Sequence, residues 1–250
     1  MYKLGRDSWL VFARQMGLLL RSPAWVFVGI MQPLFFLLLF GPLLKSIPGI
    51  GGNPYRFFIP GLLIQLSIFS GLFVGFSLIA ELRLGIIERM RVTPVSRLAL
   101  LIGRAASTVL LLLVQGILLV VVALPFGLTV QIGPLLLTLA LLALIALGFS
   151  SVSYAIALWL KSEDALAPLL NLLSLPLLLL AGVFLPMDRG PRWLLRLSQF
   201  NPFKWATDAS RALFAGHPGD PSVWKALIIL GAVAVIGVTW AARSFARAVR

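Results

Sequence analysis

The sequence predicts an all-α polytopic membrane protein, and two observations carry this prediction. The first is composition: 60% of the residues are hydrophobic, 12% are charged and the mean hydropathy is +1.03. Such a chain has too little polar surface to cover a soluble core. The second is that charge is missing from long stretches, each near or above the roughly 20 apolar residues that a membrane-spanning helix needs. These stretches are 22–44, 57–80, 105–160, 165–187 and 226–242.

The longest stretch, 105–160, decides the number of spans. Its 56 residues are too many for one helix across about 30 Å of hydrocarbon and leave no turns for three helices. Pro125, Gly127, Gly133 and Pro134 lie near its middle and favour a turn. The sequence therefore predicts six transmembrane helices, and because the stretches do not alternate polar and apolar residues, a β-barrel is disfavoured. The six helices lie near 24–44, 57–80, 105–125, 134–160, 165–187 and 224–242.

The basic residues predict that both termini lie in the cytoplasm. With six spans, 13 Lys and Arg residues lie inside and eight lie outside, as the positive-inside rule expects. A single span within 105–160 would give 15 inside and six outside, which is the stronger asymmetry. We keep six spans because helix length is the harder constraint and the first helix usually dominates orientation.

The composition also limits the chemistry that this chain can perform. The net charge of +13 is explained by orientation and anionic lipid, and the basic patch with interleaved aromatic residues that nucleic-acid binding needs is missing. The chain has no cysteine and one histidine, His217, in a loop of Gly and Pro residues, so we expect neither a metal site nor a catalytic site. A GxxxxGKS/T phosphate loop is also missing from the sequence.

Residues 1–23 are predicted to form an amphipathic helix on the membrane surface. Lys3, Asp7, Arg14 and Arg21 are four or seven positions apart and share one face. Apolar residues occupy the other faces, and a frayed polar tail would leave them in water. They are Leu4, Trp9, Leu10, Phe12, Met16 and Leu19.

The segment 81–104 carries seven of the 29 charged side chains of the protein, between the second and third spans. Gly85 weakens the helix that leaves the membrane, and Thr93-Pro94 is a good helix start, with Thr as the N-cap and Pro at the first position. We therefore expect two short helical pieces with a bend near 91–94, and we expect Arg104 to face the lipid headgroups.

An ordinary positive-inside loop is the alternative for this segment. It would explain the arginines, but not Glu81, Glu88 or the Thr-Pro start. A bent segment of mixed charge suits docking to another protein, where charge pairs fix the register.

The segment 188–222 is too polar to span a membrane, yet it is rich in Trp, Phe and Leu. Asn201-Pro202 separates two short amphipathic pieces, near 190–200 and 202–215. We expect them to lie at the outer membrane interface or to dip into it. A folded external loop is the alternative.

The polar and small residues of the second span form a further group. Helix packing is the simpler explanation of the Gly-x-x-x-Gly pattern, and a transport pathway or a seam between two copies is the alternative. The residues of this group are Gln65, Ser67, Ser70, Gly71 and Gly75.

Two of these segments resemble the signatures of ABC-2 type permeases, the membrane subunits of ABC exporters. The stretch ELRLGIIERMRVTPVSRLALLIGR is similar to the cytoplasmic signature, although Ile86 stands where the family usually has Thr. It matches at Glu81, Gly85, Glu88, Thr93, Pro94, Ser96, Arg97, Gly103 and Arg104. The stretch AGVFLPMDRGPRWLLRLSQFNPFKWATDASRALF is similar to the outer segment of the family. It matches at Gly182, Pro186, Pro191, Asn201, Pro202, Asp208 and Arg211. The likeness covers the whole chain and is strongest to the daunorubicin-resistance branch.

The resemblance implies one permease domain, 1–250, in the inner membrane of a bacterium. It would export a hydrophobic or amphipathic substrate such as a drug, a lipid or a lipid-linked glycan. A separate ATPase subunit would bind ATP and Mg²⁺, and a second permease copy, identical or not, would complete the transporter, so this chain would need no cofactor and would not be an enzyme. An ion-coupled secondary transporter or a channel-like protein is the alternative. It is disfavoured because no titratable group, charge ring or filter is expected within the spans.

The resemblance also assigns residues to roles. Segment 81–104 would couple the spans to the ATPase through Glu81, Arg83, Gly85, Glu88, Arg89, Arg91, Thr93, Pro94, Ser96 and Arg97. Segment 188–222 would cap the outer end of the pathway, together with Pro186, which lies two residues before it. Its assigned residues are Pro186, Trp193, Asn201, Pro202, Asp208 and Arg211.

Overall fold

A computed structural model describes residues 2–21, 23–44, 54–85, 97–184, 187 and 190–248. Within these ranges the chain is almost entirely helical and contains no strand. Five of the described helices are long and apolar enough to cross a membrane, and a shorter apolar helix, Phe27–Leu43, accompanies them. The prediction of an all-α polytopic membrane protein is therefore confirmed.

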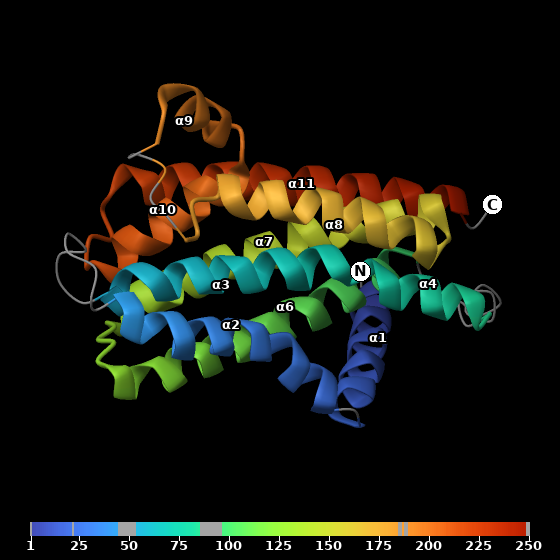
Figure 1. Cartoon of the computed structure of the whole chain (residues 1–250). Helices are drawn as coiled ribbons and strands as arrows, with labels where there is room; N and C mark the ends of the chain where they lie inside the picture. Colours follow the sequence, from blue (N-terminus) through green and yellow to red (C-terminus); the bar gives the residue numbers. More distant parts are fainter. Residues whose placement is uncertain are drawn as a thin grey trace.

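The long helices run side by side along one axis (Figure 1). They are α2 (Pro23–Leu44), α3 (Pro54–Phe73) with its continuation α4 (Gly75–Arg83), α6 (Arg97–Ala123), α7 (Ile132–Leu160), α8 (Glu163–Leu180) and α11 (Pro221–Ala248). Helix α7 is the central one and packs against α11, α3 and α6. We call the two ends of this bundle the α4 end, where the C-terminal end of α11 also lies, and the α10 end (Figure 1).

Glycines allow the two most closely packed helices, α7 and α11, to approach each other. A Cβ atom at Gly237 would lie 2.6 Å from the carbonyl oxygen of Gly148. A Cβ atom at Gly148 would in turn lie 3.0 Å from the Cα atom of Ala234. Lipid supplies no hydrophobic driving force between helices, so van der Waals packing stabilises such a crossing, and small residues allow the backbones to come close enough for it.

The second span is interrupted at Val74, between α3 and α4, by a side chain from α7. The hydroxyl of Ser153 donates a hydrogen bond to the Leu72 carbonyl and accepts one from the Gly75 N–H at 2.9 Å. Both groups lie next to the interruption, where the regular helical hydrogen bonds are broken. A side chain inserted into the hydrogen-bond ladder is a recognised cause of helix kinks.

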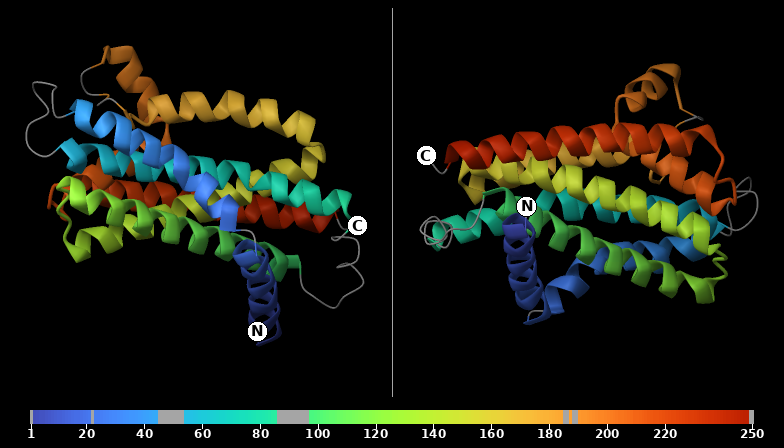
Figure 2. Two further views of the ribbon diagram at one scale, coloured as in Figure 1. Left: turned by 60° about the horizontal axis from the view of Figure 1, so that its bottom comes forward. Right: turned by 180° about the vertical axis from the view of Figure 1, so that it is seen from behind.

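Helix α1 (Tyr2–Arg21) lies crosswise to the spans (Figures 1 and 2). It packs on α6 at Gly103, where a Cβ atom would lie 2.7 Å from the Ser8 carbonyl oxygen. Trp9 and Leu10 are exposed, as an interfacial helix requires. The predicted polar face is wrong at one position: Asp7 is only 7% exposed, because the side of α1 that turns towards α6 includes it.

The α10 end carries η1 (Leu124–Phe126), α9 (Arg192–Gln199) and α10 (Pro202–Phe214). Helix α10 packs against α11, α3 and α7, and Phe203, Ala206 and Ala209 are fully buried. Helix α9 stands away from the bundle (Figure 2). The structure thus has two short helices on either side of Asn201, and their re-entry into a membrane stays a prediction.

Two predicted boundaries are wrong. The sequence predicts that the third span begins at 105, but α6 begins at Arg97, so that Arg104 lies inside the helix. It also predicts that the fifth span extends to 187, but α8 ends at Leu180. The chain turns there at Gly182, whose φ of 70° is unfavourable for other residues.

Candidate functional site

A buried ion pair joins the second and third spans at the α4 end. Arg104 of α6 pairs through Nη2 with Oε2 of Glu81, which lies near the end of α4. The two residues are 3% and 9% exposed. The expectation that Arg104 faces the headgroups is therefore wrong, because the longer α6 carries it into the bundle, where Glu81 compensates its charge.

The second carboxylate oxygen of Glu81 binds a third helix. Gln15 of α1 donates from Nε2 to Glu81 Oε1 at 3.2 Å. A second contact between α1 and α6 lies nearby, where Ser107 Oγ is 3.5 Å from the Phe12 carbonyl oxygen. The side chain of Glu81 therefore ties α1, α4 and α6 together, immediately before the 86–96 connection.

Most of the predicted coupling residues lie in that connection. Glu88, Arg89, Arg91, Thr93, Pro94 and Ser96 fall outside the described residues, and the backbone of Arg97 begins α6. Arg83 lies on the surface, 3.7 Å from Glu163 of α8. Gly85 follows the end of α4 with a φ of 66°, a left-handed conformation that commonly ends helices.

A cavity of about 570 Å³ lies beside the ion pair, which is within the usual range for small-molecule sites. Arg104 is the only charged residue among those that line it, and its Nη1 atom is buried without a hydrogen-bond partner in the described part of the chain. A buried donor in this state costs about 1–3 kcal/mol unless a ligand or water accepts from it. The other polar lining residues are Gln15, Gln32, Ser70, Ser77, Ser107, Thr108, Gln115 and Tyr154.

The predicted group in the second span is divided between packing and this cavity. Ser70 lines the cavity. Gly71 and Gly75 instead face α7, since Cβ atoms there would lie 3.0 Å from Phe149 Cβ and 2.7 Å from Ser153 Oγ. Ser67 bonds its own helix at the Leu63 carbonyl, at 2.8 Å. The fifth member, Gln65, is fully buried, and its amide has no hydrogen-bond partner among the described residues.

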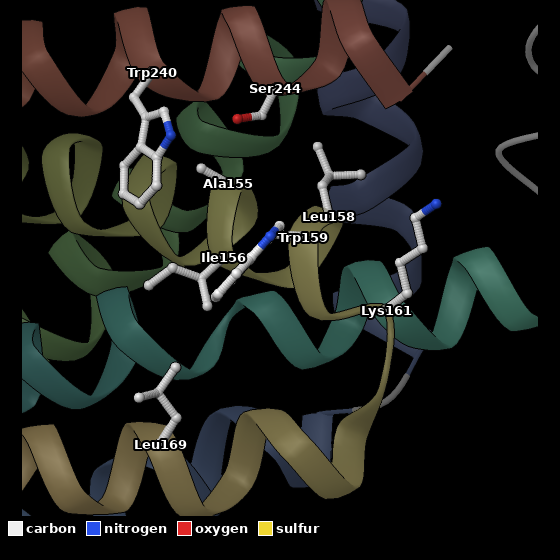
Figure 3. Close-up of a pocket in the computed structure, with 8 residues that line it drawn as sticks. All are labelled: Ala155, Ile156, Leu158, Trp159, Lys161, Leu169, Trp240 and Ser244. Carbon is white, nitrogen blue, oxygen red and sulfur yellow. The ribbon is translucent and has the colours of Figure 1, made fainter. Parts of the chain in front are cut away.

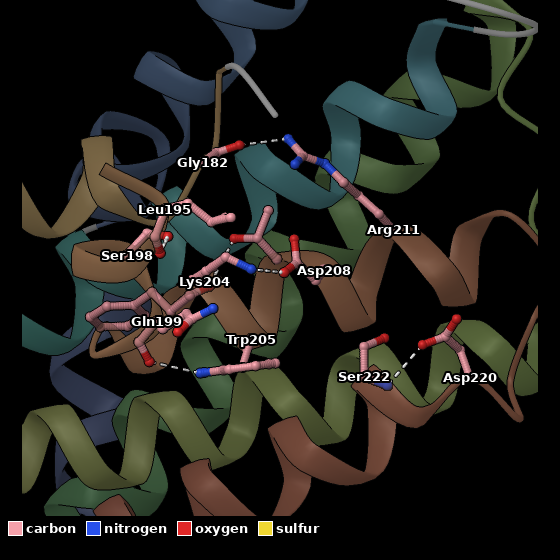
Figure 4. Close-up of polar contacts among 12 residues, drawn as sticks. Gly182, Leu195, Ser198, Gln199, Lys204, Trp205, Asp208, Arg211, Asp220 and Ser222 are labelled. Atoms are coloured by element: carbon pink, nitrogen blue, oxygen red, sulfur yellow. Dashed lines mark hydrogen bonds and ion pairs between the residues drawn. The ribbon is translucent and has the colours of Figure 1, made fainter. Parts of the chain in front are cut away.

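At the α10 end, Arg211 of α10 holds the turn that follows α8 (Figure 4). Its Nη2 donates to the carbonyl oxygens of Gly182 at 2.8 Å and Val183 at 3.0 Å, and its Nε donates to Phe57 at 3.3 Å. The guanidinium carbon also lies 3.7 Å from the centre of the Phe57 ring. Arg211 therefore joins α10 to α3 and to the end of α8.

Asn201 makes a second link in this region. Its Oδ1 caps α10 by accepting from the Phe203 N–H at 3.0 Å, and its Nδ2 donates to the Leu177 carbonyl at 2.7 Å. Pro202 follows at the first helical position.

The remaining residues predicted for the outer segment have different environments. Asp208 forms an ion pair with Lys204 at 2.6 Å (Figure 4), Trp193 is exposed on α9, and Pro186 is outside the described residues.

Asp220 lies just before α11 and accepts a hydrogen bond from the Ser222 N–H at 2.8 Å. Hydrogen bonding by Ser222 holds the pKa of the Asp220 carboxyl below its usual range.

A second cavity, of about 670 Å³, lies between α7, α8 and α11 (Figure 3). Trp159, Trp240 and Lys161 line it together with mainly aliphatic residues. Trp159 is 79% exposed and Trp240 is 46% exposed. Unlike the first cavity, it has no buried charged residue among the described residues of its lining, and it suits the apolar chains of membrane lipid.

Two residues of the site are not apparent from the sequence. Arg104 matches the cytoplasmic signature, but its burial depends on the start of α6, which the sequence places too late. Gln15 carries no signal, since its contact with Glu81 spans 66 positions and depends on the crosswise placement of α1. Within the described residues, no group of three or more His, Asp or Glu residues is placed to hold a metal ion.

Comparisons of the sequence with a family profile and with individual proteins agree with one another. Residues 6–215 match the profile of a family described as ABC-2 type transporter. The chain is 29% identical over 203 residues to a protein of Cyanophora paradoxa described as a putative transport permease, ycf38, covering 78% of this chain and 69% of the relative. It is also 29% identical over 211 residues to the daunorubicin resistance ABC transporter permease protein DrrB1 of Streptomyces coeruleorubidus, covering 82% and 74% respectively.

Proposed function

Because the chain belongs to the family of ABC-2 type transporters and is thus a multi-pass transport permease, we propose that it serves an ATP-driven exporter. It moves a hydrophobic or amphipathic molecule, such as a drug, a lipid or a lipid-linked glycan, out of the cytoplasm. The energy comes from a separate ATPase subunit, which binds ATP and Mg²⁺. The name of the Streptomyces relative supports a drug as one such cargo.

One observation carries the coupling part of this proposal. Segment 81–104, which the signature assigns to ATPase contact, is anchored at both ends by the Glu81–Arg104 pair. Because Gln15 binds the same carboxylate, a force applied to the segment acts on α1, α4 and α6 together. The interruption at Val74 then offers a point at which α4 can tilt relative to α3.

The remaining parts of the proposal follow the family and the layout of the helices. The protein lies in the inner membrane of a bacterium with both termini in the cytoplasm, and it works with a second permease copy. The surface of α2 supports such contacts, since Phe27, Phe35 and Leu39 are more than half exposed. In lipid, this face meets either acyl chains or the second copy.

One observation favours the alternative of ion-coupled transport. Glu81 and Arg104 are buried titratable residues within apolar helices, and such residues often mark proton or ion pathways. The two functions differ in their source of energy, so a single reconstitution distinguishes them.

The test is reconstitution in liposomes with and without the stand-alone ATPase that we expect to be encoded beside this gene. With the ATPase and Mg²⁺-ATP, we expect the chain to concentrate at least one compound from a panel of amphipathic molecules that includes daunorubicin. Without the ATPase, uphill transport is expected neither with ATP nor with a proton gradient. Uphill transport by the chain alone would refute the proposal and favour the alternative.

The buried pair provides the variants for this test. We expect Glu81→Lys to abolish transport although the ATPase still binds, and we expect Arg104→Glu in the same chain to restore part of it. The control is Glu163→Gln, which removes the exposed contact with Arg83. It is expected to change transport by less than about fivefold, because surface ion pairs contribute only about 0–1 kcal/mol.

A further inference from the structure

The cavity beside the ion pair is elongated and changes in character along α6. Arg104, Ser107, Thr108, Leu111 and Gln115 line it on successive turns of this helix. The first and last of them are 11 residues apart, which corresponds to about 16 Å at 1.5 Å per residue. The end near Arg104 carries this one charged group with the hydroxyl groups of Ser107 and Thr108, whereas Leu111 on the next turn is apolar.

The opposite wall completes this division. Phe69 and Phe73 of α3 line the cavity with Leu111, and they provide a surface for an apolar chain. Gln115 lies over Gly29 of α2, where a Cβ atom would come within 2.7 Å of its Nε2, so α2 and α6 are close together there. The cavity also reaches the surface, since Val28 and Ser77 line it and are exposed.

The electrostatics of the polar end favour an acceptor. Glu81 is engaged by both Arg104 and Gln15, and none of the described residues that line the cavity is acidic. Arg104 therefore presents, within the described part of the chain, an unpartnered N–H group at the polar end of the cavity. The hydroxyl groups of Thr108 and Tyr154 lie there too and are 3.5 Å apart. Arginine binds phosphate and carboxylate groups particularly well, because its donors are fixed in one plane.

We propose that this cavity binds an amphipathic molecule whose anionic phosphate or carboxylate head accepts hydrogen bonds from Arg104. Its apolar chain lies along Phe69, Phe73 and Leu111 and leaves the cavity beside Val28. A phospholipid of the membrane and a transported acidic amphipath share this chemistry. The site lies within one protomer and shares Arg104 with the proposed coupling pair, but binding at this site does not depend on ATP.

The experiment uses the full chain in phosphatidylcholine nanodiscs without ATPase or ATP. Photoreactive phosphatidylglycerol and a photoreactive single-chain fatty acid are cross-linked in separate samples, and the labelled peptides are identified by mass spectrometry. We expect at least one probe to label the parts of α3 and α6 that line the cavity. A photoreactive phosphatidylcholine, which carries no net charge, is expected to label them at least tenfold less.

Two variants alter the site in different ways. Arg104→Lys keeps a positive charge for Glu81 but removes the second N–H group, and Ser70→Phe fills the cavity without touching the pair. Each is expected to reduce labelling at least fivefold. The matched control is Ser244→Phe, the same substitution in the lining of the second cavity (Figure 3), which should leave labelling unchanged.

Competition identifies the source of the ligand. If excess phosphatidylglycerol displaces the fatty-acid probe but excess fatty acid does not displace the phosphatidylglycerol probe, the cavity holds a membrane phospholipid. If only the fatty acid displaces the other probe, the ligand is a transported acidic amphipath. Labelling that is equal for the zwitterionic probe, or unchanged in both variants, would overturn the proposal. Because nothing in this assay uses ATP, its failure and a failure of ATP-driven transport are distinguishable.

Discussion

Single polar side chains hold several helices of this protein together, and Ser153 is a clear example. Its hydroxyl lies at the interruption between α3 and α4 and bonds the backbone of both helices. In a bilayer no water replaces such a bond, so the Gly75 N–H and the Leu72 carbonyl depend on this one side chain. Glu81 acts similarly, because its two oxygens bind different helices.

We expect Ser153→Ala to lower the free energy of unfolding by about 1–3 kcal/mol, because it leaves the Gly75 N–H and the Leu72 carbonyl without their partner. Unfolding in mixed micelles measures the change. The control is Ser151→Ala on the same helix, since among the described residues the Ser151 hydroxyl bonds the Leu147 carbonyl of its own helix, at 2.7 Å, and no other group. Equal effects of the two substitutions would show that the interruption does not depend on Ser153.

Among the elements, the pair α7 and α11 depends on close backbone contact. A methyl group at position 237 would meet the carbonyl oxygen of Gly148 at 2.6 Å, and a backbone atom can move aside only if the helices separate. Gly231, also on α11, has space around it. Apart from the adjacent backbone of α11 itself, no described atom would lie within 4 Å of a methyl group at this position.

We therefore expect Gly237→Ala to reduce the yield of folded protein or to lower its unfolding temperature strongly. Gly231→Ala should be neutral or stabilise the helix by up to about 1 kcal/mol, because alanine has the higher helix propensity. Size-exclusion chromatography and thermal unfolding in detergent test both variants. A harmless Gly237→Ala would mean that α7 and α11 tolerate a wider separation than their close contact indicates.

The short helix α10 is an element that depends on Arg211. Arg211→Lys keeps the charge but cannot bond the carbonyl oxygens of Phe57, Gly182 and Val183 together. We expect faster hydrogen exchange in α10 and at the end of α8 in this variant. Arg196→Lys on the exposed surface of α9 is the control, and similar exchange in both variants would contradict this role of Arg211.

At the scale of the whole molecule, the chain offers a clean test of topology because it has no cysteine. His217 lies in the exposed loop between α10 and α11, and Arg83 lies on the surface at the opposite, α4 end. We expect an impermeant thiol reagent to label His217→Cys in intact cells and Arg83→Cys only after the membrane is opened. The reverse pattern would place both termini outside.

The sequence predicts the helices of this protein better than the contacts between them. The Pro and Gly residues within 105–160 predict a turn, and η1 with the residues up to Gln131 lies there. The break at Asn201 is predicted in the same way. The contacts of the candidate site are only partly predicted. Glu81 pairs with Arg104 and Ser70 lines the cavity beside this pair, whereas Gly71 and Gly75 contact α7.

By itself, the sequence determined that the chain is a helical membrane protein and approximately where its apolar helices lie, because hydrophobic length and breaker residues are local properties of a segment. It also contained the signatures of the family. Only the tertiary structure decided that Arg104 and Asp7 are buried, that α7 receives the glycines of α3 and α4, and that Arg211 binds a residue 154 positions away. These contacts depend on how helices distant in the sequence cross, and the free energy of a buried charge depends on the partner that it meets there.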